Sequence, residues 1–285
     1  MTATARARAF TQVDVFTQIP LRGNPVAVVL DGAGIDDAAM QAFANWTNLS
    51  ETTFVLPATD AAADYALRIF TPKSELPFAG HPTLGTAHAV LAARLAQPRG
   101  GKLVQQCAIG LVEIDVGDGG LSFTLPTATL TPAPALDMLA AALGAALLAP
   151  PMVVDVGPRW VVGEVSGWDA LGALRPDIAA LAAYDRAHGV TGQTLFARDA
   201  DPAGPLLVRS FAAGDGIAED PVCGSGNGAV AAFRLAQGSL VDGDRYTAVQ
   251  GRSVGRDGRV EVRIVDGAVH VGGACCTVIS GVVLL

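Results

Sequence analysis

The chain has 285 residues, which is enough for two domains of ordinary size, and a hydrophobic content of 51% that excludes intrinsic disorder. Its formal net charge of −8, without any cluster of Lys and Arg, argues against a nucleic-acid partner. The four cysteines show no C-x-x-C spacing, as is typical of reduced thiols in a cytoplasmic protein.

No targeting sequence or membrane anchor is predicted. The first residues include Arg6 and Arg8, but no apolar segment follows them before Asp14. The longest apolar run, residues 138–149, is too short to span a bilayer, so we predict a buried helix there.

Turn residues and hydrophobic patterns predict alternating short strands and helices along the chain. In the first half these are strands at 12–16 and 26–30, a helix capped by Asp36 and running to about Trp46, strands at 52–56 and 67–70, a helix starting just after Pro82, and strands at 112–115 and 121–125. A Pro- and Thr-rich stretch, 126–134, is the best candidate for a linker. The second half is predicted to contain strands within 153–165, a helix near 176–184, a strand at 206–211, a helix from about Gly224, strands at 260–264 and 268–271, and a final buried strand at 277–285.

The two halves share a sequence motif. Residues 85–97 align with residues 225–237, with Val, Arg, Leu and Gln at coincident positions. A period of about half the chain is too long for a solenoid and indicates two copies of one α+β domain. We expect these domains to face each other across a cleft, with the N-terminus of each motif helix directed at it. Such N-termini attract anions.

Two glycine-rich segments superficially resemble nucleotide-binding motifs. The glycines at 224, 226 and 228 do not have the G-x-G-x-x-G spacing of a dinucleotide site. The segment from Gly80 to Thr86 has the spacing of a P-loop but lacks its lysine. Neither segment therefore predicts a nucleotide cofactor.

Three segments stand out as candidates for chemistry: Asn48–Thr53, Phe78–Thr83 and Glu219–Gly228. Together with Asp14-Val-Phe and Gly23-Asn-Pro-Val-Ala-Val, they resemble the PhzF-like (phenazine biosynthesis) family, whose members are relatives of diaminopimelate epimerase. The resemblance covers essentially the whole chain.

The resemblance implies an α+β fold with two pseudo-twofold-related domains, in each of which strands wrap around a central helix. The domains would comprise residues 1–128, with 278–285 returning as a C-terminal strand, and residues 129–277. It also implies a cofactor-free, homodimeric isomerase that moves a proton on a small carboxylate held between the domains. The sequence itself contains no pattern that predicts a metal site, a nucleic-acid partner or a membrane partner.

Glu51 matches the catalytic carboxylate of the family in its Ser-Glu-Thr setting. The reaction needs a base that removes a carbon-bound proton and returns it elsewhere. Apolar neighbours at Phe54 and Leu56 should raise the pKa of Glu51 towards about 6–7 by desolvation, which suits that role.

Further residues match positions that line the family's pocket. His81 and Asp220 would assist proton transfer or orient the substrate. The substrate carboxylate would be bound by backbone N–H groups and a hydroxyl at Gly80, Gly224 and Ser225. Ser50 matches a substrate-contacting position less securely.

Two alternatives remain open, and the first of them involves Cys223. Epimerases of the superfamily use a pair of cysteines, but the position that corresponds to Cys223 in the first half is Ala79, so a two-thiol inversion is not possible. A racemase or epimerase that uses Glu51 against Cys223 remains one alternative, and a non-catalytic protein that binds small anions is another. The tryptophans Trp46, Trp160 and Trp168 are predicted to be packing residues.

Overall fold

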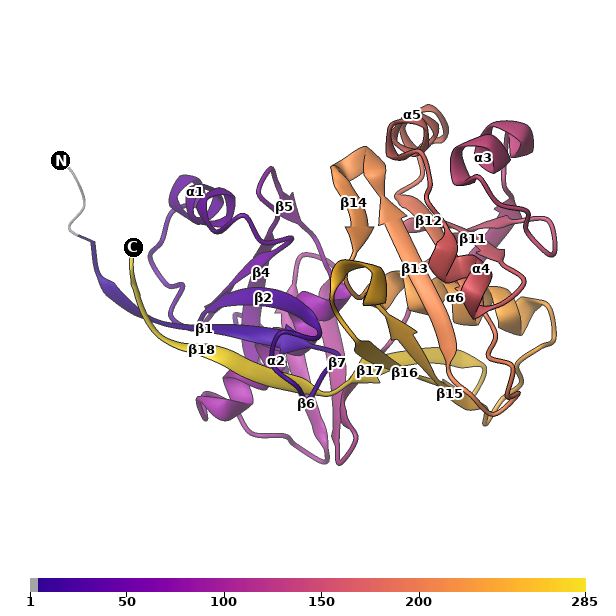
Figure 1. Cartoon of the computed structure of the whole chain (residues 1–285). Coiled ribbons are helices and arrows are strands. Elements are labelled where there is room, and N and C mark those ends of the chain that lie inside the picture. The colour runs from indigo at the N-terminus through magenta and orange to yellow at the C-terminus, as the bar shows by residue number, and fades with distance from the viewer. Residues whose placement is uncertain (1–4) are drawn as a thin grey trace. The chain divides into compact units, whose positions relative to one another are not determined.

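The computed structural model describes residues 5–285. Residues 1–4 lie outside the described residues; they belong to the segment in which no targeting sequence is expected. The chain divides into two compact units (Figure 1). Unit 1 contains the chain up to Phe123 together with Gly272–Leu285, and unit 2 contains Thr124–Val271. No helix in the described part of the chain is both long and apolar enough to cross a membrane.

Unit 1 is built on a mixed sheet with two helices, α1 (Asp37–Thr47) and α2 (Gly80–Ala92). Its strands are β1 (Ala7–Val15), β2 (Asn24–Val29), β3 (Thr52–Leu56), β4 (Tyr65–Phe70), β5 (Glu75–Leu76), β6 (Lys102–Cys107), β7 (Gly110–Gly117), β8 (Gly120–Thr124) and β18 (Cys275–Leu284). Strand β1 pairs antiparallel with both β18 and β2. The sheet then continues β2-β3-β4-β6-β7-β8, with the β2–β3 and β4–β6 pairs parallel and the other pairs antiparallel.

Unit 2 repeats this arrangement. Its strands are β9 (Thr129–Pro132), β10 (Met152–Asp155), β11 (Arg159–Glu164), β12 (Gly192–Ala197), β13 (Leu206–Ala212), β14 (Ile217–Asp220), β15 (Arg245–Gln250), β16 (Gly258–Val265) and β17 (Ala268–Gly273). Its helices are α3 (Leu136–Leu143), α4 (Trp168–Ala173), α5 (Ile178–His188) and α6 (Gly224–Ala236), with short 3₁₀ turns at Ala213–Asp215 and Arg252–Val254.

The strand pairings confirm two copies of one α+β arrangement. Strand β10 pairs with β9 and β11 as β1 pairs with β18 and β2. The parallel β11–β12 and β13–β15 pairs correspond to β2–β3 and β4–β6. In both units the motif helix lies in the chain between the two strands of the second parallel pair.

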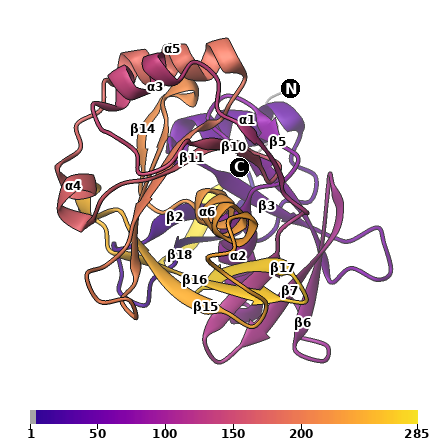
Figure 2. The ribbon, with the colours of Figure 1, turned by 90° about the vertical axis from the view of Figure 1, so that its right-hand side faces the viewer.

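The motif helices α2 and α6 are the central helices of their units, and each buries most of its residues. Figure 2 shows α6 enclosed by strands of its unit. Glycines make the close packing possible. A Cβ atom on Gly85 would lie 2.4 Å from Val26 Cγ1, and one on Gly228 would lie 2.0 Å from Leu125 Cδ1. Neither position therefore has room for a side chain while its neighbours stay in place.

The alignment of residues 85–97 with residues 225–237 was wrong by about one helical turn, whereas the correspondence of Ala79 with Cys223 agrees with the helix starts. The alignment paired Gly85 with Ser225, whereas both helices have thirteen residues and begin at Gly80 and Gly224. A shift of four residues returns to nearly the same face of a helix. The register in which Gly85 pairs with Ser225 therefore also matched small residues with small ones and apolar residues with apolar ones.

Two segments differ from their sequence predictions. The stretch proposed as a linker contains β9, which pairs antiparallel with β10. The apolar run at 138–149 is helical only as far as Leu143, because Gly144 ends α3 in the left-handed conformation, with φ of 66°.

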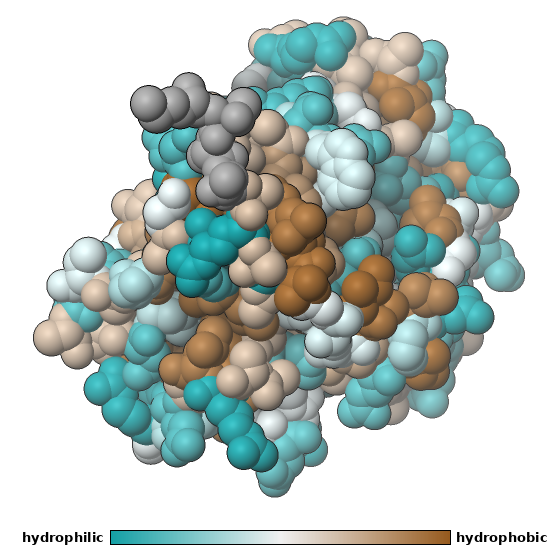
Figure 3. All heavy atoms as spheres, turned by 90° about the vertical axis from the view of Figure 1, so that its left-hand side faces the viewer, coloured by the Kyte–Doolittle hydropathy of each residue, from teal (hydrophilic) through white to brown (hydrophobic). Residues whose placement is uncertain are grey.

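The C-terminal strand was predicted to be buried, and this prediction was wrong for many of its side chains. In β18, Ile279, Val282 and Leu284 are 48%, 68% and 70% exposed. Figure 3 shows apolar atoms at the surface on the side of the molecule where β1 begins and β18 ends. Trp46, predicted to be a packing residue, stacks its ring on Phe43 but is 80% exposed.

Candidate active site

Glu51 lies in unit 1 between the end of α1 and the start of β3. Asn48 ends α1 in the left-handed conformation, with its N–H donating to the Ala44 carbonyl, and turns the chain toward β3. The Glu51 carbonyl accepts a hydrogen bond from the N–H of Ala27 in β2 at 3.4 Å. The backbone that carries the carboxylate is thereby tied to the sheet.

The Glu51 carboxylate faces His81. The distance from Glu51 Oε2 to His81 Nε2 is 3.2 Å, and the two side chains are 14% and 9% exposed. His81 is the second residue of α2, so it projects from the first turn of the central helix. The structure therefore brings these two predicted site residues into direct contact within one unit.

Burial raises the pKa of Glu51 from 4.5 to about 7, while a hydrogen bond from the Ser50 side chain acts in the opposite direction. At neutral pH the carboxyl group is thus populated in both its acid and its base form, as a group that takes up and returns a proton requires. Ser50, predicted to contact substrate, contacts the Glu51 carboxyl group.

Polar side chains hold the first turns of α2 in place beside Glu51. The hydroxyl of Thr53, in β3, donates to the Ala27 carbonyl and lies 2.9 Å from the hydroxyl of Thr86 in α2. Gly80 begins the helix against the ring of Phe123, where an added Cβ would lie 2.9 Å from the ring. The absence of a side chain at Gly80 therefore allows this close approach.

In unit 2, the other predicted site residues gather at the start of α6. Asp220 ends β14, and its Oδ1 accepts a hydrogen bond from the N–H of Val222 at 3.0 Å. Cys223 is the N-cap residue of α6 and is 5% exposed. Its Sγ accepts the N–H of Gly226 at 3.2 Å and lies 3.6 Å from the Ser225 hydroxyl oxygen. Gly224 is the first residue of α6.

Trp160 contributes a hydrogen bond to this set of polar residues, a role that the sequence did not predict. Its indole Nε1 donates to the Ser225 Oγ at 3.0 Å from β11, and the side chain is almost fully buried. The sequence assigned Trp160 to packing alone, because nothing in its local pattern shows that β11 passes beside the start of α6. The bond occupies an acceptor position of Ser225 and leaves its hydroxyl hydrogen as a donor.

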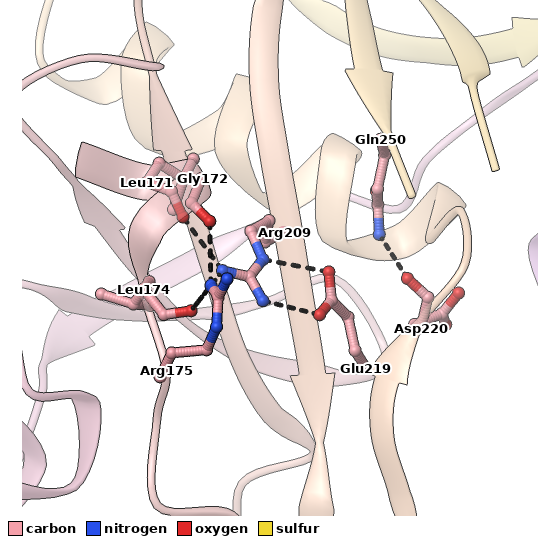
Figure 4. A network of polar contacts seen from close by, with 8 residues as sticks. All are labelled: Leu171, Gly172, Leu174, Arg175, Arg209, Glu219, Asp220 and Gln250. Carbon is pink, nitrogen blue, oxygen red and sulfur yellow. Dashed lines mark hydrogen bonds and ion pairs between the residues drawn. The ribbon is translucent and has the colours of Figure 1, made fainter. Parts of the chain in front are cut away.

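Two further residues support the segment that carries Asp220 (Figure 4). Arg209 makes a two-pronged ion pair with Glu219 at 3.0 and 2.7 Å, and its Nη1 also donates to the carbonyls of Leu171 and Leu174. Gln250 Nε2 donates to the Asp220 carbonyl at 3.1 Å. Neither residue was singled out from the sequence.

Within residues 5–285, no group of three or more His, Cys, Asp and Glu side chains is placed to hold a metal ion. The arrangement that the structure does show consists of two sets of polar groups, each at the N-terminus of a central helix. One contains the Glu51–His81 pair, and the other contains Asp220, Cys223 and Ser225.

Comparison with known proteins supports a single family. The family model for phenazine biosynthesis-like proteins matches residues 13–281. Antisense-enhancing sequence 1 of Schizosaccharomyces pombe is 37% identical over 290 residues, which cover 96% of this chain and 97% of that protein. The trans-2,3-dihydro-3-hydroxyanthranilate isomerase of Pseudomonas fluorescens is 34% identical, with 86% of each chain covered.

The solved structures agree on the fold. The crystal structure of a Bacillus anthracis phenazine biosynthesis protein of the PhzF family superimposes with a TM-score of 0.87 at 24% identity, covering 98% of this chain and 100% of that one. Several relatives bear the name isomerase, which argues against a non-catalytic anion-binding protein. The chain therefore belongs to the family of phenazine biosynthesis-like proteins and is an isomerase of the PhzF type.

Proposed function

We propose that the protein is a cofactor-independent isomerase in which Glu51 moves a proton between two carbon atoms of a small carboxylated metabolite. The observation that carries this proposal is the buried Glu51 carboxyl group, whose pKa of about 7 accompanies a 3.2 Å contact with His81. A carboxyl group with a pKa near the working pH can serve as base and then as acid in one turnover.

The proposed reaction conserves all atoms. The Glu51 carboxylate takes a proton from a carbon of the substrate, and the electron pair of the broken C–H bond delocalises into the adjacent unsaturated system. The protonated Glu51 then delivers the same proton to a different carbon, which relocates a double bond and restores the carboxylate. His81 holds the Glu51 carboxylate in the orientation needed for both steps.

We propose that the substrate carboxylate is bound by N–H groups at the starts of α2 and α6, at Gly80, Gly224 and Ser225, and by the Ser225 hydroxyl. Asp220 would orient a substrate amine or hydroxyl group. Support comes from the internal repeat, which places a helix N-terminus beside the polar residues of each unit, and from the preference of helix N-termini for anions.

The experiment uses trans-2,3-dihydro-3-hydroxyanthranilate as the first probe, because the named relative isomerises it, followed by other small unsaturated carboxylates. Turnover in D₂O is followed by NMR, which reports both the product and deuterium incorporation. Glu51→Gln should lower kcat by about 10²–10⁴-fold with KM little changed, since the amide retains the shape but cannot transfer the proton.

Glu113→Gln is the matched control, because Glu113 is an exposed glutamate of the same unit paired with Lys102. It should keep wild-type kcat. If Glu51→Gln kept most of the activity on a substrate that the wild type converts, Glu51 would not be the acid/base.

A racemase or epimerase mechanism is the second candidate. The Cys223 Sγ lies at the N-cap of α6, where it accepts the Gly226 N–H. In that mechanism Glu51 and Cys223 would act from opposite faces of one carbon. A two-base reaction incorporates solvent deuterium with inversion at that carbon, so the NMR experiment separates it from double-bond relocation.

We also propose a cytoplasmic homodimer. None of its four cysteines, all within residues 5–285, forms a disulfide, as suits a reducing compartment. Strand β18 has no charged residue in ten positions, although several of its apolar side chains are exposed. An uncharged strand suits a symmetric interface with a second copy. Light scattering should report a dimer that Val282→Lys dissociates, whereas Ile109→Lys, at another exposed apolar position, leaves it intact.

A further inference from the structure

We propose that Gln250 is a positioning residue that holds the segment from Asp220 to Cys223 and the first turn of α6 in one arrangement. The proposal rests on the proposed function, since that function assigns Asp220, Gly224 and Ser225 to the substrate. It adds a residue on β15, a strand to which the sequence analysis assigned no role.

The Gln250 side chain is completely buried and makes three hydrogen bonds. Its Oε1 accepts the N–H of Cys223 at 3.1 Å and the Nδ2 of Asn227 at 2.8 Å. Its Nε2 donates to the Asp220 carbonyl at 3.1 Å, as Figure 4 shows. Both lone pairs of the oxygen are thus engaged, so the orientation of the amide group is determined. One side chain thereby links the end of β14 to the start of α6.

Backbone atoms near Gln250 also pack against the segment from Asp220 to Cys223. Gly251 has a φ of +95°, and a Cβ there would lie 2.3 Å from the Pro221 carbonyl oxygen. A Cβ on Gly258, at the start of β16, would lie 2.2 Å from Val222 Cγ2. Glycines therefore let Pro221 and Val222 rest directly on the backbone, while Gln250 supplies the polar contacts.

Unit 1 contains a buried glutamine with a similar role. Gln105 lies on β6, which corresponds to β15, and is also completely buried. Its Nε2 donates to the hydroxyl of Thr83, the fourth residue of α2, just as Asn227 is the fourth residue of α6. Both copies of the domain thus use a buried glutamine to hold the first turn of the central helix, two residues beyond His81 in one case and beyond Ser225 in the other.

A glutamine is needed at position 250 because the surrounding groups include both donors and an acceptor. The Cys223 N–H and the Asn227 amide require an acceptor, whereas the Asp220 carbonyl requires a donor. An apolar residue of the same size leaves all three without this partner, and a buried polar group without a partner is costly. We therefore expect the segment to open locally when the amide is removed.

The experiment compares Gln250→Met with Gln193→Met. Gln193 is another completely buried glutamine of unit 2, and its amide donates to Asp185 on α5, away from α6. Both variants lose buried hydrogen bonds, so both should be less stable in urea unfolding. The discriminating readout is the alkylation rate of Cys223 by iodoacetamide, located by mass spectrometry, at pH 7.5 in the absence of denaturant.

Gln250→Met should raise the alkylation rate of Cys223 by about tenfold or more through local opening, while Gln193→Met leaves it within about twofold of wild type. Gln250→Glu, which keeps an acceptor oxygen, should give an intermediate rate and serves if Gln250→Met does not fold. With the hydroxyanthranilate probe, Gln250→Met should lower kcat at least tenfold and Gln193→Met should not. The alkylation readout does not depend on Glu51, so it separates failure of this inference from failure of the proposed function. Equal alkylation rates in the two methionine variants would show that Gln250 has only a general structural role.

Discussion

The environment of single residues determines their chemistry in this protein, and Glu51 is the clearest case. A glutamate ordinarily titrates near 4.5, but burial in unit 1 raises the pKa of Glu51 to about 7. The same burial makes its ionised form unfavourable in the folded protein. Its proposed role in proton transfer and its effect on stability therefore have one physical cause.

A dependence of stability on pH follows from this shift. Between pH 4.5 and about 7 the folded protein keeps a proton on Glu51 that the unfolded chain has lost, so the contribution of this group to stability falls as pH rises through that window. A shift of this size corresponds to about 3 kcal/mol. Glu51→Gln should therefore be more stable than wild type at pH 8 by about that amount, and equally stable at pH 4.

Urea unfolding at the two pH values measures this difference. Glu113→Gln is again the control, because an exposed carboxylate has no comparable desolvation to relieve. A stability difference between Glu51→Gln and wild type that stays the same at pH 4 and pH 8 would contradict the assignment of the raised pKa to Glu51.

Cys223 separates the two candidate mechanisms. Its Sγ caps α6 by accepting the Gly226 N–H, a role that a serine hydroxyl also performs well. We expect Cys223→Ser to change kcat by less than about tenfold, because the one-base mechanism needs the cap and not the thiol. Steady-state kinetics on an identified substrate measures this effect. A loss of several orders of magnitude would instead support the epimerase mechanism, in which the thiol transfers a proton.

At the scale of the elements, the close approach of each central helix to its sheet depends on glycine. An alanine Cβ at Gly85 would lie 2.4 Å from Val26 Cγ1 and 2.9 Å from Val15 Cγ2. Gly85→Ala should therefore destabilise the protein by about 1–3 kcal/mol through overpacking.

Gly172→Ala is the matched control for this prediction. Gly172 is also helical, in α4, but an added Cβ there meets nothing within 4 Å. This substitution should stabilise the protein by about 0.5–1 kcal/mol through helix propensity. Thermal or urea unfolding of the two variants gives the comparison, and similar effects of both would show that the α2–sheet contact tolerates an extra methyl group.

At the scale of the whole molecule, the absence of cofactor motifs predicts that turnover needs no pyridoxal phosphate, nicotinamide, flavin or metal. Purified protein should show no absorbance above 320 nm, and extended dialysis against EDTA should leave kcat unchanged. Activity that is lost on chelation and restored by one divalent metal would overturn this prediction. The named hydroxyanthranilate substrate provides the assay if the protein converts it, and another small carboxylate does so otherwise.

The sequence by itself was sufficient for much of the local structure and for the duplicated α+β fold. Asp36 caps α1 as predicted, because a cap involves an oxygen and an N–H only a few residues apart. The raised pKa of Glu51 was also predicted, from its apolar neighbours. The family resemblance that named Glu51, His81 and Asp220 depended on short segments that are recognisable without any knowledge of how they fold together.

Tertiary structure alone decided which distant residues meet. Trp160 reaches Ser225 and Gln250 reaches Asp220, and these contacts depend on strand order and register that no local pattern encodes. The register of the repeat was misjudged because a shift of one helical turn preserves the face of a helix. Burial of β18 was misjudged because apolar composition does not tell which face of a strand the rest of the chain covers.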